Sequence, residues 1–344
     1  MALFNLLSCR RLTALLGAMA FGLTACSESP SPIPQLTIDQ DRIAVAGMSS
    51  GAYMAHQMHL AYSDRLIGAA LFSGGPYGCA RGDLNIALGG CMNPPDAAMP
   101  DLDSLANAVR ERSADGRLAP LSGLAGDRLY IWHGKQDQVV SERISSASAA
   151  LYRSLTAEVK VSEAYDSDAA HVFPTEAAGV ACGGAESPYI GACGFDGAGA
   201  AIRHLYQPEQ NLDPPVTAQG TLREFGAEVP NGADVPGDSR GLIYLPQQCE
   251  QGKTCGLLIV LHGCEQSLGK IGDRFARDAG FNRWADALDL VVLYPQAQSS
   301  LMPLNPKACW DWWGYTGPDY DTRQGAQMQW IAAMSRALGA PLDD

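Results

Sequence analysis

A serine flanked by glycines, placed between a strand pattern and a helix pattern, constrains the fold of this chain most. Residues 42–46 form a short apolar run typical of a buried strand, and residues 52–61 have helical composition. Between them stands Gly47-Met-Ser-Ser-Gly51. A strand that passes directly into a helix needs a tight, strained turn, and flanking glycines make room for that backbone. The pattern predicts a strand–turn–helix unit that holds Ser49 clear of a sheet.

The rest of the chain alternates between strand and helix patterns. Further strands are expected over 67–73, 128–132, 159–165, 257–261 and 290–294, with helices over 142–155, 275–288 and 321–338. Alternating segments at residues 222–229 and 241–246, joined by a turn rich in Gly, Asn, Asp and Pro, predict a hairpin. Such alternation indicates an α/β fold, with a mostly parallel sheet and helices on both faces.

The N-terminal residues have the composition of an export signal. Arg10 and Arg11 precede an apolar run over residues 12–23, which is too short for a mature membrane helix. The run ends in Leu23-Thr-Ala-Cys26, which resembles a bacterial lipobox. We therefore expect a lipoprotein-type signal peptide at 1–25, lipidation of Cys26, a Ser/Pro-rich tether at 26–37 and one domain at 38–344. An ordinary signal cut nearby, or twin-arginine export, is the alternative.

Eight of the ten cysteines remain once Cys9, in the signal, and Cys26 are set aside. An even number of cysteines in an exported chain favours disulfides, although eight can pair in roughly a hundred ways. Close neighbours in the sequence are Cys79 with Cys91, Cys182 with Cys193, and Cys249 with Cys255, while Cys264 lies within reach of Cys309. Metal binding is the rival interpretation, but there is no C-x-x-C motif. We interpret His56 and His59, three apart on the predicted helix, as packing or surface residues and expect no metal.

The formal net charge of −13 argues against nucleic-acid binding. A phosphate-binding surface needs clustered Lys and Arg, and the sequence contains no such cluster.

Ser49 is the candidate nucleophile. Gly-x-Ser-x-Gly occurs by chance in many chains, and the alternative is a Ser/Gly loop that merely joins two elements. The strand–turn–helix context favours a nucleophile elbow. Ser50 is a rival, but it is not placed between the two glycines in the same frame.

A serine nucleophile needs a base and an acid that orients the base. In α/β-hydrolases these follow in the order Ser, Asp, His, each on a loop after a strand. Asp137 comes after strand 128–132, and His171 comes after strand 159–165. A surface-turn role is the alternative for Asp137. His204 competes with His171 but lies in a helical stretch.

The oxyanion hole normally uses one amide after the nucleophile and another from a loop after an early strand. Ser50 supplies the first. Only the signal and tether precede Ser49, and the second candidate is Cys264, in Leu261-His-Gly-Cys264 after the most apolar strand. This order predicts a circularly permuted α/β-hydrolase in which residues 206–220 join the former termini.

Several separated motifs resemble the permuted extracellular poly(3-hydroxybutyrate) depolymerases, a family of polyhydroxyalkanoate esterases. They are Gly47-Met-Ser-Ser-Gly-Ala-Tyr-Met-Ala55, His171-Val-Phe-Pro-Thr175, Leu261-His-Gly-Cys264 and Cys309-Trp-Asp-Trp312. The resemblance implies a triad of Ser49, Asp137 and His171, oxyanion amides from Ser50 and Cys264, and an ester-binding cleft lined by Trp310 or Trp312. Core packing is the alternative for these tryptophans. A Cys264–Cys309 bridge would pin the aromatic segment beside the oxyanion loop.

By this resemblance the enzyme transfers an acyl group from a polyester or oligoester to Ser49 and then to water, without metal or cofactor. We see no added substrate-binding domain, and a lipid tether suits insoluble granules poorly. The substrate is therefore oligomers, or polymer held by exposed apolar residues. A feruloyl or acetyl esterase of plant polysaccharide is the alternative enzyme, and a non-catalytic binding lipoprotein the alternative class. We expect export to the bacterial envelope (outer membrane or periplasm), with the lipid as the one membrane contact, or else an extracellular protein.

Overall fold

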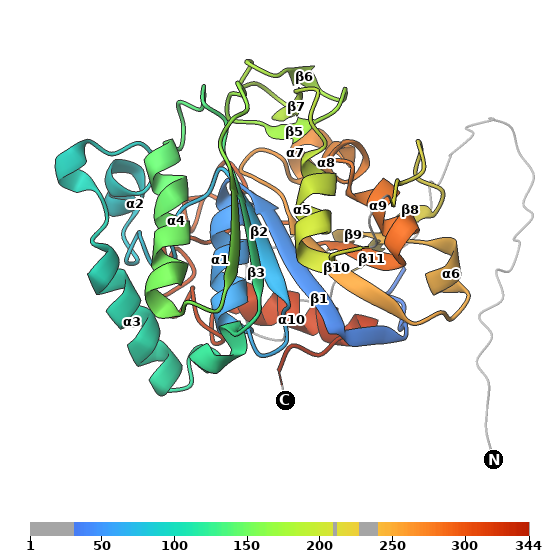
Figure 1. The fold of residues 1–344 in the computed structure, drawn as a ribbon, viewed down its shortest axis with the longest axis horizontal. Coiled ribbons are helices and arrows are strands. Elements are labelled where there is room, and N and C mark those ends of the chain that lie inside the picture. The colour runs from blue at the N-terminus through green and yellow to red at the C-terminus, as the bar shows by residue number, and fades with distance from the viewer. Residues whose placement is uncertain (1–30, 209–211, 227–239, 344) are drawn as a thin grey trace, which may run out of the picture.

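The computed structural model describes residues 31–208, 212–226 and 240–343, which build one eight-stranded sheet between two layers of helices (Figure 1). The strand order is β4-β3-β2-β1-β10-β11-β9-β8. This confirms the predicted α/β class, with a mostly parallel sheet. The predicted signal peptide and Cys26 lie outside the described residues.

Six adjacent strands of this sheet run parallel, from β4 at one edge to β11. They are β1 (Ile38–Met48), β2 (Gly68–Phe72), β3 (Arg128–Trp132), β4 (Lys160–Ala164), β10 (Cys255–Leu261) and β11 (Leu290–Tyr294). The expected hairpin forms from β8 (Thr221–Gly226) and β9 (Arg240–Leu245), and β9 pairs antiparallel with β11. All seven residues of β10 are buried, because helices cover both faces of the sheet there.

Residues of β1 alternate between two hydrophobic cores. Ile43 and Val45 pack on one face, and Ala44 and Ala46 on the other. The first face is covered by α1 (Ser50–Ala61), α3 (Leu102–Ala114), α4 (Glu142–Leu155) and α10 (Ala326–Leu338). The second is covered by α5 (Gly197–Tyr206), α8 (Arg274–Asp278) and α9 (Phe281–Leu288). Shorter helices are α2 (Leu84–Gly90), α6 (Gln247–Glu250) and α7 (Leu268–Ile271).

Two predicted helices differ from those observed. The helix expected over 275–288 is two helices, α8 and α9, because Gly280 adopts φ 93° and ends the first. The last helix begins at Ala326 rather than at 321, since Asp321 is buried in an ion pair with Arg112. A small sheet of β5 (Phe173–Thr175), β7 (Ile190–Ala192) and β6 (Val180–Ala181) was not expected, because strands of two or three residues carry no periodicity.

The described part of the predicted tether contacts the body of the domain. The Leu36 amide donates to Leu338 O at 2.9 Å, and the Cys255 amide donates to Thr37 O at 3.0 Å. These bonds bring the start of the domain beside the end of α10. The C-terminus lies below β1 and α10 (Figure 1), while the first described residues run on beside β8, where the Gly226 amide donates to Ser31 O.

Four disulfides form: Cys79–Cys91, Cys182–Cys193 and Cys249–Cys255 between close neighbours in the sequence, and Cys264–Cys309 between distant segments. Three of them close short loops, and the fourth joins segments 45 residues apart. Across the described ranges, none of the helices combines the length and the apolar character that a membrane crossing requires.

Candidate active site

Ser49 occupies a strained turn between β1 and α1. Its backbone has φ 54° and ψ −119°, and its amide donates to Phe72 O at 2.8 Å. A Cβ on Gly47 would lie 2.0 Å from Gly51 O, and one on Gly51 would lie 2.2 Å from Leu261 O. Both positions therefore require glycine. Strain of this kind is costly and is concentrated at functional sites.

His171 links Ser49 to Asp137. Its Nε2 lies 2.9 Å from Ser49 Oγ, and its Nδ1 lies 2.7 Å from Asp137 Oδ2. An ionised carboxylate only accepts hydrogen bonds, so Nδ1 carries the proton and Nε2 is left to accept from the serine hydroxyl. This is the tautomer that a general base for serine requires. The loops after β1, β3 and β4 bring these three residues together.

The carboxylate of Asp137 is held on both oxygens. Oδ1 accepts from the amides of Val139 and Val140 at 2.8 and 2.9 Å, while Oδ2 accepts from His171. Burial raises the pKa of Asp137, but the interaction with His171 and the hydrogen bond from the Val140 amide outweigh it and hold the pKa below its ordinary value. Asp137 therefore stays ionised and fixes the imidazole. His133, beneath it, lies 2.8 Å from Val140 O and 3.7 Å from Asp137 Oδ2.

The loop after β10 reaches Ser49 from the neighbouring strand. β1 and β10 are paired with Gly47 beside Leu261, and a Cβ on Gly263 would lie 3.3 Å from Ser49 Cβ. Neither the Ser50 amide nor the Cys264 amide donates a hydrogen bond to another described residue. Both are therefore free to donate to a bound oxyanion.

A pocket of about 160 Å³ opens beside these groups. Its apolar walls come from Met48, Tyr53, Met92, Val139, Val140 and Trp312, and its polar rim from Tyr189, Glu265, Gln266 and Lys307. Trp312 stacks on Tyr53 with ring centroids 4.4 Å apart. The pocket is small, mostly apolar and open at the triad, as an ester-binding cleft would be.

Trp310 does not line this pocket, which corrects the prediction made for it. Its backbone amide donates to Ser50 Oγ at 3.3 Å, and its indole is fully buried in the core next to His262. The segment then turns, because the carboxylate of Asp311 accepts from the amides of residues 313–316. That turn directs Trp312 into the pocket.

Several pocket residues carry a weaker sequence signal. Tyr53 stands four residues after Ser49, in the first turn of the helix that Ser49 precedes, a spacing that could have identified it. Asp311 is a buried acid amid aromatic residues, which marks a structural carboxylate. Met92, Val139 and Val140 belong to loops whose positions depend on tertiary packing alone.

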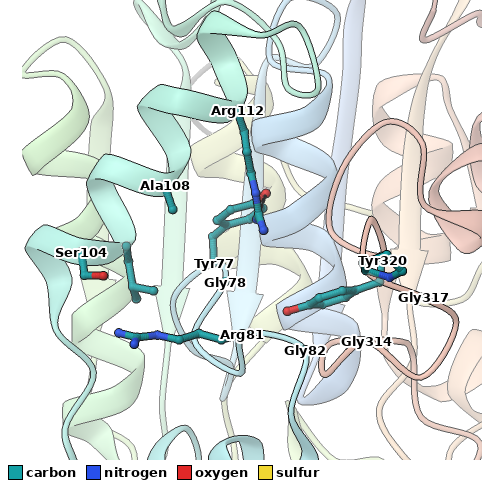
Figure 2. A pocket seen from close by; sticks show the side chains of 12 residues that line it. Tyr77, Gly78, Arg81, Gly82, Ser104, Ala108, Arg112, Gly314, Gly317 and Tyr320 are labelled. Atoms are coloured by element: carbon teal, nitrogen blue, oxygen red, sulfur yellow. Dashed lines mark hydrogen bonds between the residues drawn. The ribbon is translucent and has the colours of Figure 1, made fainter.

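A second, more open pocket of about 540 Å³ lies between α3 and the loop 314–320 (Figure 2). None of the three triad residues lines it. Arg112 projects into it from α3, where Tyr77 accepts from its guanidinium at 2.7 Å and the buried Asp321 forms its ion pair. The charge of Arg112 is thereby neutralised, and we assign no ligand here. Within the described ranges, no group of three or more His, Cys, Asp or Glu could hold a metal ion.

Comparison with known proteins places this geometry among related enzymes. No protein-family model matches the chain. A poly(3-hydroxybutyrate) depolymerase of Delftia acidovorans is 36% identical over 307 residues, which cover 88% of this chain and 60% of the relative. A polyhydroxybutyrate depolymerase of Talaromyces funiculosus is 32% identical over 337 residues, which cover 93% of this chain and 96% of the relative.

Solved structures show the same likeness. The crystal structure of a PHB depolymerase from Penicillium funiculosum superposes with a TM-score of 0.80 at 31% identity, covering 90% of this chain and 98% of that one. A structure of a PHB depolymerase variant complexed with an R3HB trimer superposes equally well. The chain therefore spans nearly all of the fungal enzymes but about three fifths of the Delftia relative.

Proposed function

This chain belongs to the poly(3-hydroxybutyrate) depolymerase family, and on that premise we propose that it is a serine esterase that hydrolyses poly(3-hydroxybutyrate) or its oligomers. The observation that carries the proposal is the continuous hydrogen-bonded chain Ser49–His171–Asp137. It lies beside two unengaged amides, those of Ser50 and Cys264.

In the proposed mechanism Ser49 Oγ attacks the ester carbonyl carbon while His171 Nε2 takes the hydroxyl proton. Asp137 stabilises the resulting imidazolium. The amides of Ser50 and Cys264 donate to the oxyanion of the tetrahedral intermediate. His171 returns the proton to the leaving alkoxide, which departs as an alcohol. Water, deprotonated by His171, then attacks the acyl-enzyme and releases the hydroxy acid and free Ser49.

The pocket suits a short acyl chain, because apolar side chains such as Tyr53, Met92 and Trp312 surround the serine. Trp312 is the proposed substrate contact. The structure with an R3HB trimer concerns a related enzyme and supports an oligoester as the ligand class. We include polymer as well as oligomer because exposed apolar side chains flank the segments that line the pocket.

Two groups of side chains make up this flanking surface. Leu301, Met302 and Leu304, exposed by 81%, 93% and 60%, precede Lys307 of the pocket rim. Leu84, Ile86 and Leu88 of α2 precede Met92. An apolar polyester surface would remove such groups from water.

The function is tested by following 3-hydroxybutyrate release from a polymer film and from a soluble trimer, with ferulate release from arabinoxylan measured in parallel. Ser49→Ala should abolish release, and Asp137→Asn should lower kcat by about 10⁴-fold. The control Asp168→Asn changes an exposed acid on the same side and should retain activity. Ferulate release without 3-hydroxybutyrate release would establish the alternative esterase.

Polymer binding is separated from catalysis by the double variant Leu301→Ser/Met302→Ser. It should adsorb poorly to the film and clear it slowly, while its rate on the soluble trimer stays at the wild-type level. Equal adsorption of variant and wild type would remove this surface from the proposal.

We also propose that the domain is circularly permuted. The loop carrying Cys264 comes more than 200 residues after Ser49, yet β10 pairs directly with β1. The segment that leads into β1 and the end of α10 are neighbours through the Leu36–Leu338 hydrogen bond. These two observations support a joint within residues 206–220.

We also propose that the protein is exported and carries a lipid on Cys26. The lipid would hold the enzyme at the bacterial envelope. Disulfides favour an oxidising compartment. Mass spectrometry of the mature N-terminus tests the anchor. A diacylglyceryl adduct on Cys26 that disappears in Cys26→Ser is expected, and an unmodified N-terminus downstream of Cys26 would contradict it.

A further inference from the structure

Two buried side chains form hydrogen bonds with the loop that follows β10. His262 and Gln266 are each 1% exposed, and both bond to Gly263. His262 Nδ1 lies 2.7 Å from Gly263 O, which also accepts from the Gln266 amide at 3.2 Å, and the Gly263 amide donates to Gln266 Oε1 at 2.7 Å. Gly263 is thus held on both its donor and its acceptor.

The hydrogen bonds of His262 define its tautomer. The Ala297 amide donates to its Nε2 at 3.0 Å, and a backbone N–H can only donate. Nε2 is therefore the acceptor nitrogen of a neutral ring, and Nδ1 carries the proton and donates to Gly263 O. Burial supports the neutral ring by lowering the pKa of His262 to about 4.

The Gly263 carbonyl belongs to the same peptide group as the Cys264 amide. A peptide group is planar, so a hydrogen bond that fixes its C=O also fixes the direction of its N–H. His262 therefore orients the Cys264 N–H without touching a substrate.

Gln266 holds the preceding peptide and ties the loop to a second wall of the pocket. While Oε1 accepts from Gly263, Nε2 donates to Pro188 O and to Tyr189 O, both at 3.0 Å. Tyr189 lines the pocket, and its carbonyl accepts from Phe173, two residues after His171. Gln266 thus connects the loop of Cys264 with the segment next to His171.

We propose that His262 and Gln266 are positioning residues that set the direction of the Cys264 amide toward the oxyanion. The inference rests on the proposed esterase function. A donor aimed at the oxyanion acts on the transition state more than on the bound ester, so its misalignment lowers kcat and leaves KM nearly unchanged.

The experiment compares His262→Leu with His262→Asn on the soluble trimer and on a p-nitrophenyl ester. Leucine cannot donate, whereas the asparagine Nδ2 stands close to the place of the histidine Nδ1. We expect His262→Leu to lower kcat by up to about 10²-fold, which is the effect of losing a whole oxyanion donor. Its KM should stay within about twofold of the wild-type value. His262→Asn should regain at least about tenfold of that loss.

Gln266→Met keeps the volume of the side chain and removes its hydrogen bonds. It should also lower kcat by about tenfold or more. Asn282→Leu is the matched control: Asn282 is a buried amide that donates to Ala276 O at 2.8 Å and accepts from Tyr294 at 2.7 Å, remote from the triad. It should lower the unfolding midpoint and leave kcat unchanged.

A boronic acid gives an independent readout, because its tetrahedral adduct with Ser49 places an oxygen where the oxyanion forms. Its affinity should fall across His262→Leu and Gln266→Met in proportion to kcat/KM. Folded His262→Leu protein with a wild-type kcat, or a kcat loss in Asn282→Leu equal to that in Gln266→Met, would overturn the inference. A wild-type protein without esterase activity would instead refute the proposed function.

Discussion

Ser49 and Asp311 show how single residues shape the site. Ser49 takes a backbone conformation that favours glycine, because α1 must begin directly at the end of β1. Asp311 collects four backbone amides and the Thr316 hydroxyl at its carboxylate. Burial raises its pKa despite these bonds. One residue stores strain, and the other organises the turn that presents Trp312.

At the same scale, His56 predicts a pH dependence of stability. It is fully buried against Tyr152, and burial lowers its pKa from the ordinary 6.5 to about 3. Below pH 6.5 the unfolded chain takes up a proton that the folded chain refuses. The free energy of unfolding therefore falls as the pH drops from 6.5 toward 3, by up to about 1.4 kcal/mol per pH unit from this residue.

Urea unfolding at pH 7 and pH 5 tests this dependence. His56→Phe keeps the stacking on Tyr152 and removes the titration, so its unfolding free energy should fall less between the two pH values. His262, whose pKa burial lowers to about 4, remains in both proteins and contributes the slope they share. Parallel pH dependences of variant and wild type would contradict the prediction.

At the scale of elements, we expect two of the disulfides to differ in their effect on activity. Cys249–Cys255 closes a six-residue separation between α6 and β10, away from the triad. Cys264–Cys309 joins positions 45 residues apart and ties the proposed oxyanion loop to the segment of Trp312. The number of residues between two bridged cysteines sets how much the bridge stabilises the fold. The position of the bridge relative to the triad sets whether its loss affects activity.

Replacing each bridge by an alanine pair separates the two effects. Cys249→Ala/Cys255→Ala should lose about 2 kcal/mol of unfolding free energy and keep its kcat, whereas Cys264→Ala/Cys309→Ala should lose about 4 kcal/mol. The second pair should also lower kcat, because the bridge restrains the loop whose Cys264 backbone amide is the proposed oxyanion donor. Thermal unfolding and trimer hydrolysis measure both quantities. A wild-type kcat in the second variant would show that the bridge is only structural.

The order of elements in the whole molecule predicts that new chain termini can be placed at the proposed joint within residues 206–220. Because the Leu36 amide bonds to Leu338 O, a short Gly/Ser linker can join the C-terminus to residue 35. A chain that starts near residue 216 and ends near residue 208 should then fold and hydrolyse the trimer at about the wild-type rate.

A second permutant with the same linker, opened between Gly134 and Lys135, serves as the control. It interrupts the loop that holds Asp137 and should lose activity. Equal failure of both permutants would contradict a joint within residues 206–220.

Local sequence patterns were sufficient to locate several strands and the nucleophile turn. Apolar runs marked β3, β10 and β11, because a strand covered on both faces needs consecutive apolar residues. The glycines around Ser49 marked the elbow, since no Cβ fits at Gly47 or Gly51.

Which side chains come into contact depends instead on long-range packing. Trp310 and Trp312 have similar sequence surroundings, and only the packing at Ser50 and the turn at Asp311 send one into the core and the other to the pocket. The distances within Ser49, His171 and Asp137, and the grip of His262 and Gln266 on Gly263, depend on β1 lying between β2 and β10. That order arises from contacts between residues far apart in the chain, which no local periodicity encodes.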